Sequence, residues 1–137
     1  MLSADRRITS RELSLVAHPV LAGATIHKGA IVVLDTDGFA RPGTAAAGLT
    51  VAGHADAGVN NATGDSGDIS VTVTVSRAFR YDNDAVAPLD RGDIGSDAFI
   101  LDDHTVSADA TDRSRAGTVV DLDEDGVWIA FTPVTGT

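Results

Sequence analysis

The sequence predicts an all-β protein, a small β-barrel or sandwich of short antiparallel strands with an extended N-terminal arm. The first observation is the run of residues 68–81, in which aliphatic residues alternate with serine and threonine from Ile69 to Ser76. Because successive side chains of a strand point to opposite faces, this run has one apolar and one hydroxyl face. Turn-forming residues then recur about every ten residues, as in sandwiches and small barrels. Finally, eighteen of the twenty acidic residues are aspartate, which favours turns over helices.

The expected elements follow one another from residue 23 onward. In chain order they are a hairpin over residues 23–42, a strand over 49–55, a loop over 58–67, the strand over 68–81, one possible helical turn within 88–95, strands over 98–101 and 105–107, and a last hairpin made by 116–122 and 127–131. Arg77 interrupts the apolar alternation of residues 68–81 before Phe79 and Tyr81 resume it, which indicates a bulge or the rim of a barrel. The domain organisation is an arm over residues 1–22, a β domain over 23–132 and a tail over 133–137.

Composition narrows the classes of protein. The chain of 137 residues is long enough for one core, but aromatic residues make up only 4%, so that core consists of small aliphatic side chains. A thin core favours oligomerisation or docking on a partner. The net charge of −10 should repel phosphates, so we expect no nucleic-acid partner. No cysteine, signal-like start or membrane-length apolar run is present, so we expect synthesis in the cytoplasm and no membrane partner.

The N-terminal arm differs from the rest in charge. Residues 1–22 carry Arg6, Arg7 and Arg11 against two acids, a net of +1, whereas residues 23–137 have a net of −11. One interpretation is a loose terminus before the first strand. The other is a basic arm that binds an acidic partner surface or a neighbouring subunit.

Catalytic and metal motifs are weak or missing. Asp121, Asp123, Asp125 and Gly126 match the start of a calcium loop, but the twelfth position is Thr132 instead of glutamate, so a solvated turn is the more typical reading. The four histidines (His18, His27, His54 and His104) are far apart, and we expect surface or edge positions for them. No nucleophile elbow or phosphate loop is present. We therefore expect no enzyme activity, no catalytic residue, no metal ligand and no cofactor.

The single tryptophan is the other candidate for a functional residue. Trp128 falls on the strand face opposite Val127, Ile129 and Phe131, which form the natural core face. It is therefore either covered by a loop or exposed as an interface anchor, a role in which indole side chains are common.

Several segments in this order resemble the capsid cement, or head decoration, proteins of tailed bacteriophages. They are GATIHKGAIVVLD, AGLTVAGHADAGVNN, GDISVTVTVSRAFRYDND, DIGSDAFILDDHTVS and AGTVVDLDEDGVWIAF, and the resemblance spans about residues 23–131. It implies a compact β protein that binds the major capsid protein on the outer surface of the phage head, often as a trimer. The virion is then its location, and the family has no catalytic residues. The expected partner-binding residues are Arg6, Arg7, Arg11 and Trp128.

Two other functions remain open at this point. One is a carbohydrate- or surface-binding β module, with or without calcium at residues 121–125. The other is a different virion component, such as a head fibre base or a tail protein.

Overall fold

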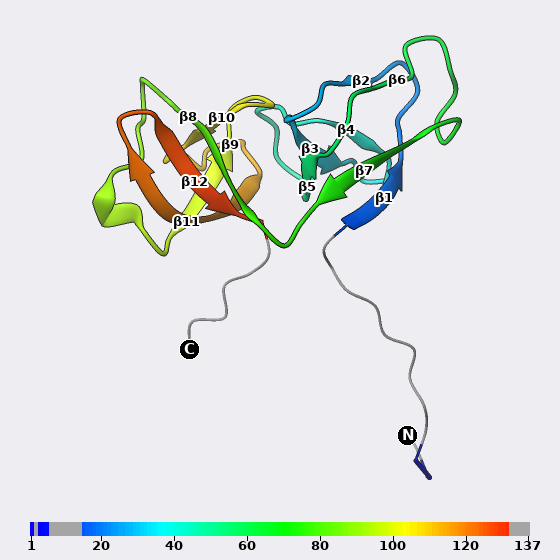
Figure 1. The fold of residues 1–137 in the computed structure, drawn as a ribbon, viewed down its shortest axis with the longest axis horizontal. Coiled ribbons are helices and arrows are strands. Elements are labelled where there is room, and N and C mark those ends of the chain that lie inside the picture. The colour runs from blue at the N-terminus through cyan, green and yellow to red at the C-terminus, as the bar shows by residue number, and fades with distance from the viewer. Residues whose placement is uncertain (2, 6–14, 132–137) are drawn as a thin grey trace.

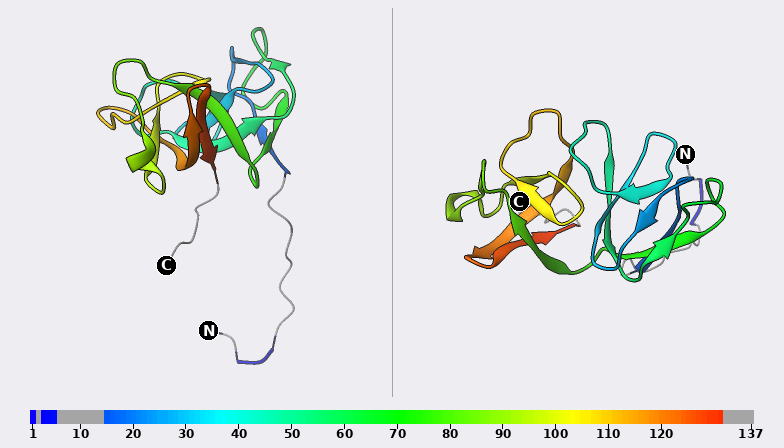
Figure 2. Two further views of the ribbon diagram at one scale, coloured as in Figure 1. Left: turned by 60° about the vertical axis from the view of Figure 1, so that its left-hand side comes forward. Right: turned by 90° about the horizontal axis from the view of Figure 1, so that it is seen from above.

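The computed structural model describes residue 1, residues 3–5 and residues 15–131, and it is built of β-strands in two lobes. The lobes lie side by side in Figure 1 and in the right-hand view of Figure 2, and residues 75–77 connect them. We call the first the sheet lobe and the second the barrel lobe. The predicted all-β class is confirmed.

The sheet lobe is a curled five-stranded antiparallel sheet. Its strands, in spatial order, are β1 (Leu15–Pro19), β7 (Ser70–Thr74), β5 (Thr50–Ala55), β3 (Ile31–Leu34) and β4 (Ala40–Pro42). A parallel bridge between Val20 and Ala40 brings the end of β1 next to β4, so the two edges of the sheet nearly meet. A short ribbon of β2 (Thr25–Ile26) and β6 (Val59–Asn60) completes the lobe.

The barrel lobe is a closed barrel of five strands. Their order around the barrel is β10 (Thr105–Ser107), β8 (Ala78–Asn83), β12 (Gly126–Ala130), β11 (Arg115–Asp123) and β9 (Asp97–Ile100). All pairs are antiparallel except β10 with β8, which is parallel. A single 3-10 turn, Arg91–Asp93, lies within the segment for which the sequence allowed one helical turn. Because the barrel is closed, each of its strands pairs with a neighbour on both sides.

The predicted strand over residues 68–81 is divided between the two lobes. Its first half is β7 and its second half is β8, separated by residues 75–77. The alternation is as expected on both sides, since Val71, Val73 and Tyr81 are buried. The interruption at Arg77 therefore marks the connection between two strands in different lobes. It is not a bulge within one continuous strand.

The boundary of the N-terminal arm also differs from the expectation. Residues 15–19 form β1, whose five residues pair with β7, and Val20 is completely buried. The β fold therefore begins by Leu15 instead of Gly23. The reason is that Val16 and His18 alternate with exposed neighbours and turn toward the covered side of the sheet.

Two hydrophobic cores meet at β3. Ile31 and Val33 pack into the barrel core, whereas Val32 packs into the core of the sheet lobe. All three side chains are fully buried. Because successive residues of a strand point to opposite faces, β3 forms a common wall between the two lobes. The lobes are therefore parts of one packed unit.

Candidate functional site

The outer wall of the barrel carries the single tryptophan. Trp128 is half-buried on β12, and its neighbours Val127 and Ile129 are fully buried on the opposite face. Pairing places Arg80 of β8 directly beside Trp128 on one side and Asp121 of β11 on the other. The predicted outward orientation of Trp128 is thus confirmed.

Arg80 lies along the barrel wall with its charged end over the indole. Its guanidinium carbon is 6.0 Å from the centre of the Trp128 ring, within the range of a cation–π contact. The stem of Arg80 crosses Gly126, where an added Cβ would lie 2.7 Å from the Arg80 Cγ. Among the described residues, no carboxylate forms an ion pair with Arg80. Arg80 is also exposed to solvent.

Small and apolar residues surround this pair. Ala78 and Ala130 are directly paired and lie on the same outer face as Arg80 and Trp128. Val120, at the irregular position of β11 between the paired residues Val119 and Asp121, keeps 38% of its surface exposed. We call these five residues (Ala78, Arg80, Val120, Trp128 and Ala130) the Trp128 face.

Asp121, the other residue that pairs with Trp128, forms an ion pair. The Asp121 carboxylate is 3.6 Å from the Arg91 guanidinium, and both side chains are largely exposed. Such a pair contributes little to stability. It nevertheless leaves the surroundings of Trp128 with one balanced pair and one unpaired cation, Arg80.

The turn at residues 121–125 is a tight hairpin connection. Asp123 pairs with Gly126 across the turn, and the Asp123 carboxylate accepts a 2.8 Å hydrogen bond from the Asp125 backbone N–H. Within the described ranges, the group of three acidic or histidine side chains with converging ligand atoms lies elsewhere, at residues 102–104. The Asp123 carboxylate thus caps the turn, and the Asp121 carboxylate pairs with Arg91.

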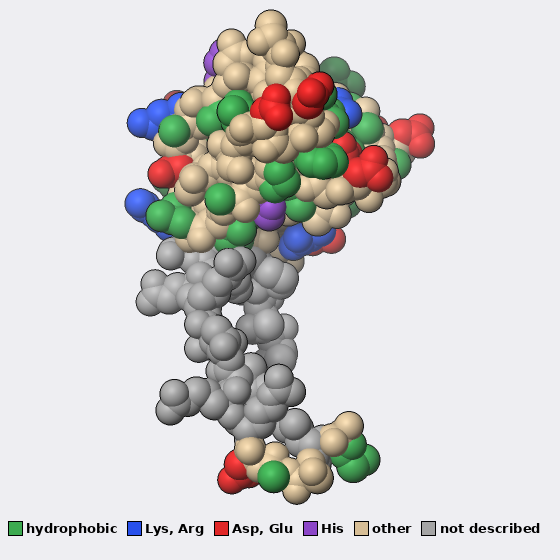
Figure 3. Space-filling view, turned by 90° about the vertical axis from the view of Figure 1, so that its right-hand side faces the viewer, with side chains coloured by type: hydrophobic (Ala, Val, Ile, Leu, Met, Phe, Trp, Pro, Cys, Tyr) green, Lys and Arg blue, Asp and Glu red, His purple; other side chains and the backbone are tan. Residues whose placement is uncertain are grey.

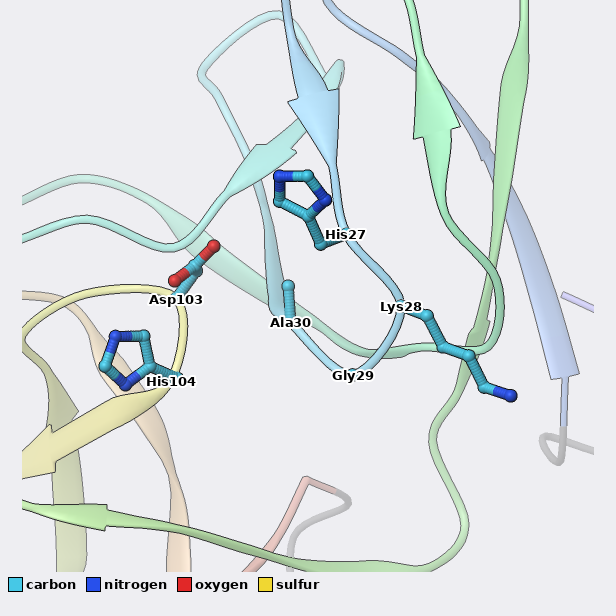
Figure 4. Close-up of a pocket in the computed structure, with 6 residues that line it drawn as sticks. All are labelled: His27, Lys28, Gly29, Ala30, Asp103 and His104. Atoms are coloured by element: carbon cyan, nitrogen blue, oxygen red, sulfur yellow. The ribbon is translucent and has the colours of Figure 1, made fainter.

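That converging group borders a shallow hollow between the lobes (Figure 4). The hollow has a volume of about 300 Å³ and is lined by His27, Lys28, Gly29, Ala30, Asp103 and His104. The backbone N–H of Ile31 donates a 2.7 Å hydrogen bond to the Asp103 carbonyl, which ties the two lobes together beside it. Ligand atoms of Asp102, Asp103 and His104 lie within 4.8 Å of one another.

His104 already has acidic partners in this group. Its Nδ1 is 3.1 Å from Asp82 Oδ2, and its Nε2 is 3.5 Å from Asp102 Oδ1. The hydrogen bond to Asp82, with smaller contributions from Asp102 and Asp103, raises the pKa of His104. The arrangement fits an exposed polar cluster that links His104 to Asp82 on β8 and to Asp102 in the turn before β10.

A histidine also connects the two lobes. The ring of His54, on β5, stacks on Phe79 of β8 with ring centres 3.7 Å apart and planes within 1°. The His54 Nδ1 is 2.6 Å from the Tyr81 hydroxyl. Burial lowers the pKa of His54 and raises the pKa of Tyr81. The expectation of a surface or edge position is wrong for His54, because its partners come from a strand that the sequence places 24 residues or more away.

A serine, an aspartate and an arginine form a buried polar group at the end of the barrel. The Ser107 hydroxyl donates to Asp84 at 2.9 Å, and Arg113 Nη1 donates to Ser107 at 2.8 Å. Hydrogen bonds from the Val86 backbone and from Ser107 lower the pKa of Asp84. Ser107 therefore has a carboxylate and a guanidinium as partners. These contacts hold the loop that contains Val86.

The predicted arginines of the arm, Arg6, Arg7 and Arg11, lie outside the described residues. The place where their segment joins the fold is nevertheless clear, since Leu15 pairs with Thr74 at the end of β7. At the other end of the described fold, Ala130 pairs with Ala78 at the start of β8. The start of β1, the end of β12 and the β7–β8 connection therefore adjoin along the lower edge of Figure 1.

On the side of the molecule seen in Figure 3, the hydrophobic side chains of the described residues are scattered among polar and acidic ones. Single exposed hydrophobic residues are normal on protein surfaces.

Comparisons with known proteins give no match from which a function could be inferred. No family model, no curated protein and no solved structure matches this chain. In the part of the chain that the structure describes, no helix has the length and apolarity required to cross a membrane.

Proposed function

We propose that this chain is a capsid cement, or decoration, protein of a tailed bacteriophage. It binds the major capsid protein on the outer surface of the head, acts as an oligomer, with a trimer favoured, and stabilises the shell without catalysing a reaction. Nucleic acid and membranes are not partners. The resemblance over residues 23–131 supports this function, and the Trp128 face is the structural observation that carries it.

The Trp128 face supports the proposal because the chain itself leaves it available. An indole lies on the wall of a closed barrel beside an arginine that has no acidic partner among the described residues, and alanines flank the two side chains. Tryptophan and arginine are enriched among the residues that contribute most to protein–protein binding. The His54–Tyr81 contact and the shared strand β3 keep the lobes in one arrangement. A rigid adhesive unit of this kind suits a protein that reinforces a larger shell.

Electron microscopy of heads made with and without this chain tests the function. Heads that lack the chain should lose surface density at defined positions, and purified protein added back should restore that density. Extra density at a head fibre base or on the tail would instead support another virion role. Failure to bind any part of the particle would refute the proposal.

The same assay tests the basic arm. Deleting residues 1–12 removes Arg6, Arg7 and Arg11 but leaves β1 intact. We expect the truncated protein to keep its β-rich circular dichroism spectrum and its melting temperature while its occupancy on heads falls. Unchanged occupancy would exclude the arm from head binding.

A further inference from the structure

We infer that the Trp128 face is the docking surface for an acidic patch on the shell. Arg80 binds a carboxylate of that patch, and Trp128 packs against an apolar group beside it. This inference rests on the proposed function and specifies the chemistry of the partner. Its evidence is the placement of Arg80, the composition of the face and the distribution of charge around it.

Arg80 is held ready to bind before any partner arrives. Its stem lies across Gly126 and its guanidinium lies over the Trp128 ring, 6.0 Å from the ring centre. Stacking restricts the rotamers of a long side chain, so less conformational entropy is lost on binding. The planar guanidinium then presents its unused N–H donors, which match the two oxygens of a carboxylate.

The strands beneath this pair are rigid. β8 and β12 are adjacent members of the closed barrel and pair over four residue positions from Val127 to Ala130. On the inner side, Val127 and Ile129 are fully buried and fix β12 against the barrel core. The placement of Arg80 beside Trp128 is therefore set by the pairing of two barrel strands.

The residues next to Trp128 leave room for a partner. Ala78 and Ala130 have side chains too short to cover the indole, and Val120 adds exposed apolar surface on β11. An apolar centre beside a charged group is the usual composition of an energetically important contact. A carboxylate next to an aliphatic or aromatic group would complement both parts of the face.

Charge around the face favours an acidic partner. The exposed Arg77 lies three residues before Arg80, in the β7–β8 connection. Asp121, the acid next to Trp128, is paired with Arg91. Arg77 and Arg80 have no ion pair with a carboxylate among the described residues.

Arg80 disfavours a second copy as a two-fold occupant of this face. A two-fold contact of the face with itself would place two Arg80 groups opposite each other, because such an interface uses the same patch on both subunits.

Point variants measured on heads that lack the chain test the inference. Arg80→Glu and Trp128→Ala should each weaken binding by about 30-fold or more, the size expected for a dominant interface residue. Arg80→Lys keeps the charge but not the planar fork, so it should fall between Arg80→Glu and the unaltered protein. The matched control is Lys28→Glu, which reverses one charge on the sheet lobe and should bind within about twofold of the unaltered protein. Melting temperatures verify that each variant is folded.

A second measurement needs no substitution in the face. Trp128 is the single tryptophan, so protein labelled with 5-fluorotryptophan gives one fluorine resonance, and unlabelled heads give none. In bound protein sedimented with heads and measured by magic-angle spinning, the chemical shift of that resonance should differ from its value in sedimented free protein. Line broadening alone is not counted, because binding anywhere on so large a particle causes it.

The outcomes separate the inference from the proposed function. If unaltered protein binds heads while both variants bind equally well, or while the fluorine chemical shift stays unchanged, the Trp128 face is not the docking surface and the function stands. If unaltered protein does not bind heads, both fail. If Arg80→Glu changes the molar mass of the free protein, the face is a contact between copies and the inference is wrong.

Discussion

The shared strand β3 predicts that the two lobes unfold together. Ile31 is completely buried in the barrel core and Val32 is completely buried in the core of the sheet lobe, although they are neighbours in sequence. Truncating either residue removes packing from one lobe, but the strand that is lost on unfolding belongs to both. A destabilisation in one core should therefore be transmitted to the other.

The expected magnitudes follow from burial. Ile31→Ala should cost about 2–5 kcal/mol of unfolding free energy, the usual range for truncating a buried isoleucine. Val32→Ala removes two methyl groups, a transfer loss of about 1.6 kcal/mol before any cavity is counted. At roughly 4 °C per kcal/mol for a chain of this size, the melting temperature should fall by about 8–20 °C for Ile31→Ala and by at least about 6 °C for Val32→Ala.

Two optical probes distinguish cooperative from separate unfolding. Trp128 fluorescence reports on the barrel lobe, because the chain has no other tryptophan, and far-ultraviolet circular dichroism reports on strands of both lobes. Val32→Ala should move the urea midpoints of both probes together. Val86→Ala, at a residue that is 92% exposed, is the control and should move neither.

Separated midpoints would refute this reasoning. If Val32→Ala lowers the circular dichroism midpoint and leaves the Trp128 midpoint in place, the sheet lobe unfolds by itself. β3 would then not couple the two cores.

Two further predictions concern a close backbone approach and a titrating pair. Gly117→Ala should lower the free energy of unfolding, measured by urea denaturation, by about 1–3 kcal/mol. The reason is that an added Cβ would meet the Ala130 carbonyl oxygen and lie 2.7 Å from Ile129 Cγ2. The control is Gly58→Ala, where the nearest atoms are 3.6 Å away, and it should be nearly neutral. Burial lowers the pKa of His54, so the neutral ring contributes to the free energy of unfolding. That contribution is fully present above the unfolded-state pKa of about 6.5, and it is lost as pH falls through the lowered pKa of the folded state. Replacing both His54 and Tyr81 with phenylalanine should flatten that acid slope in pH-dependent melting, and a slope identical to that of the unaltered protein would contradict the assignment.

Much of the fold was predictable because its signals are local. Alternation of Val71 and Val73 with hydroxyl residues selects a strand at any position in the chain, since the period of two comes from backbone geometry. The same rule placed Trp128 on the outside of its strand, and the structure agrees. The Asp-rich bends and the absence of long helices likewise follow from the turn preferences of single residues.

The division into two lobes depends on pairing between distant segments. Residues 68–81 show one continuous pattern, yet β7 pairs with β1 and β5 whereas β8 pairs with β10 and β12. Nothing within the run specifies those partners. The pairing of β1 with β7 and the parallel bridge of Val20 with Ala40 are equally non-local.

The candidate site shows the same limit. Composition and parity identify Trp128 as an outward-facing tryptophan, but its contact with Arg80 requires β8 and β12 to be adjacent in one register. His54 became a contact between lobes for the same reason, through Phe79 and Tyr81. Local sequence therefore determined which residues form strands and which way they face. Only the three-dimensional pairing of those strands decided which side chains meet, because contact energies between distant segments leave no periodic signal along the chain.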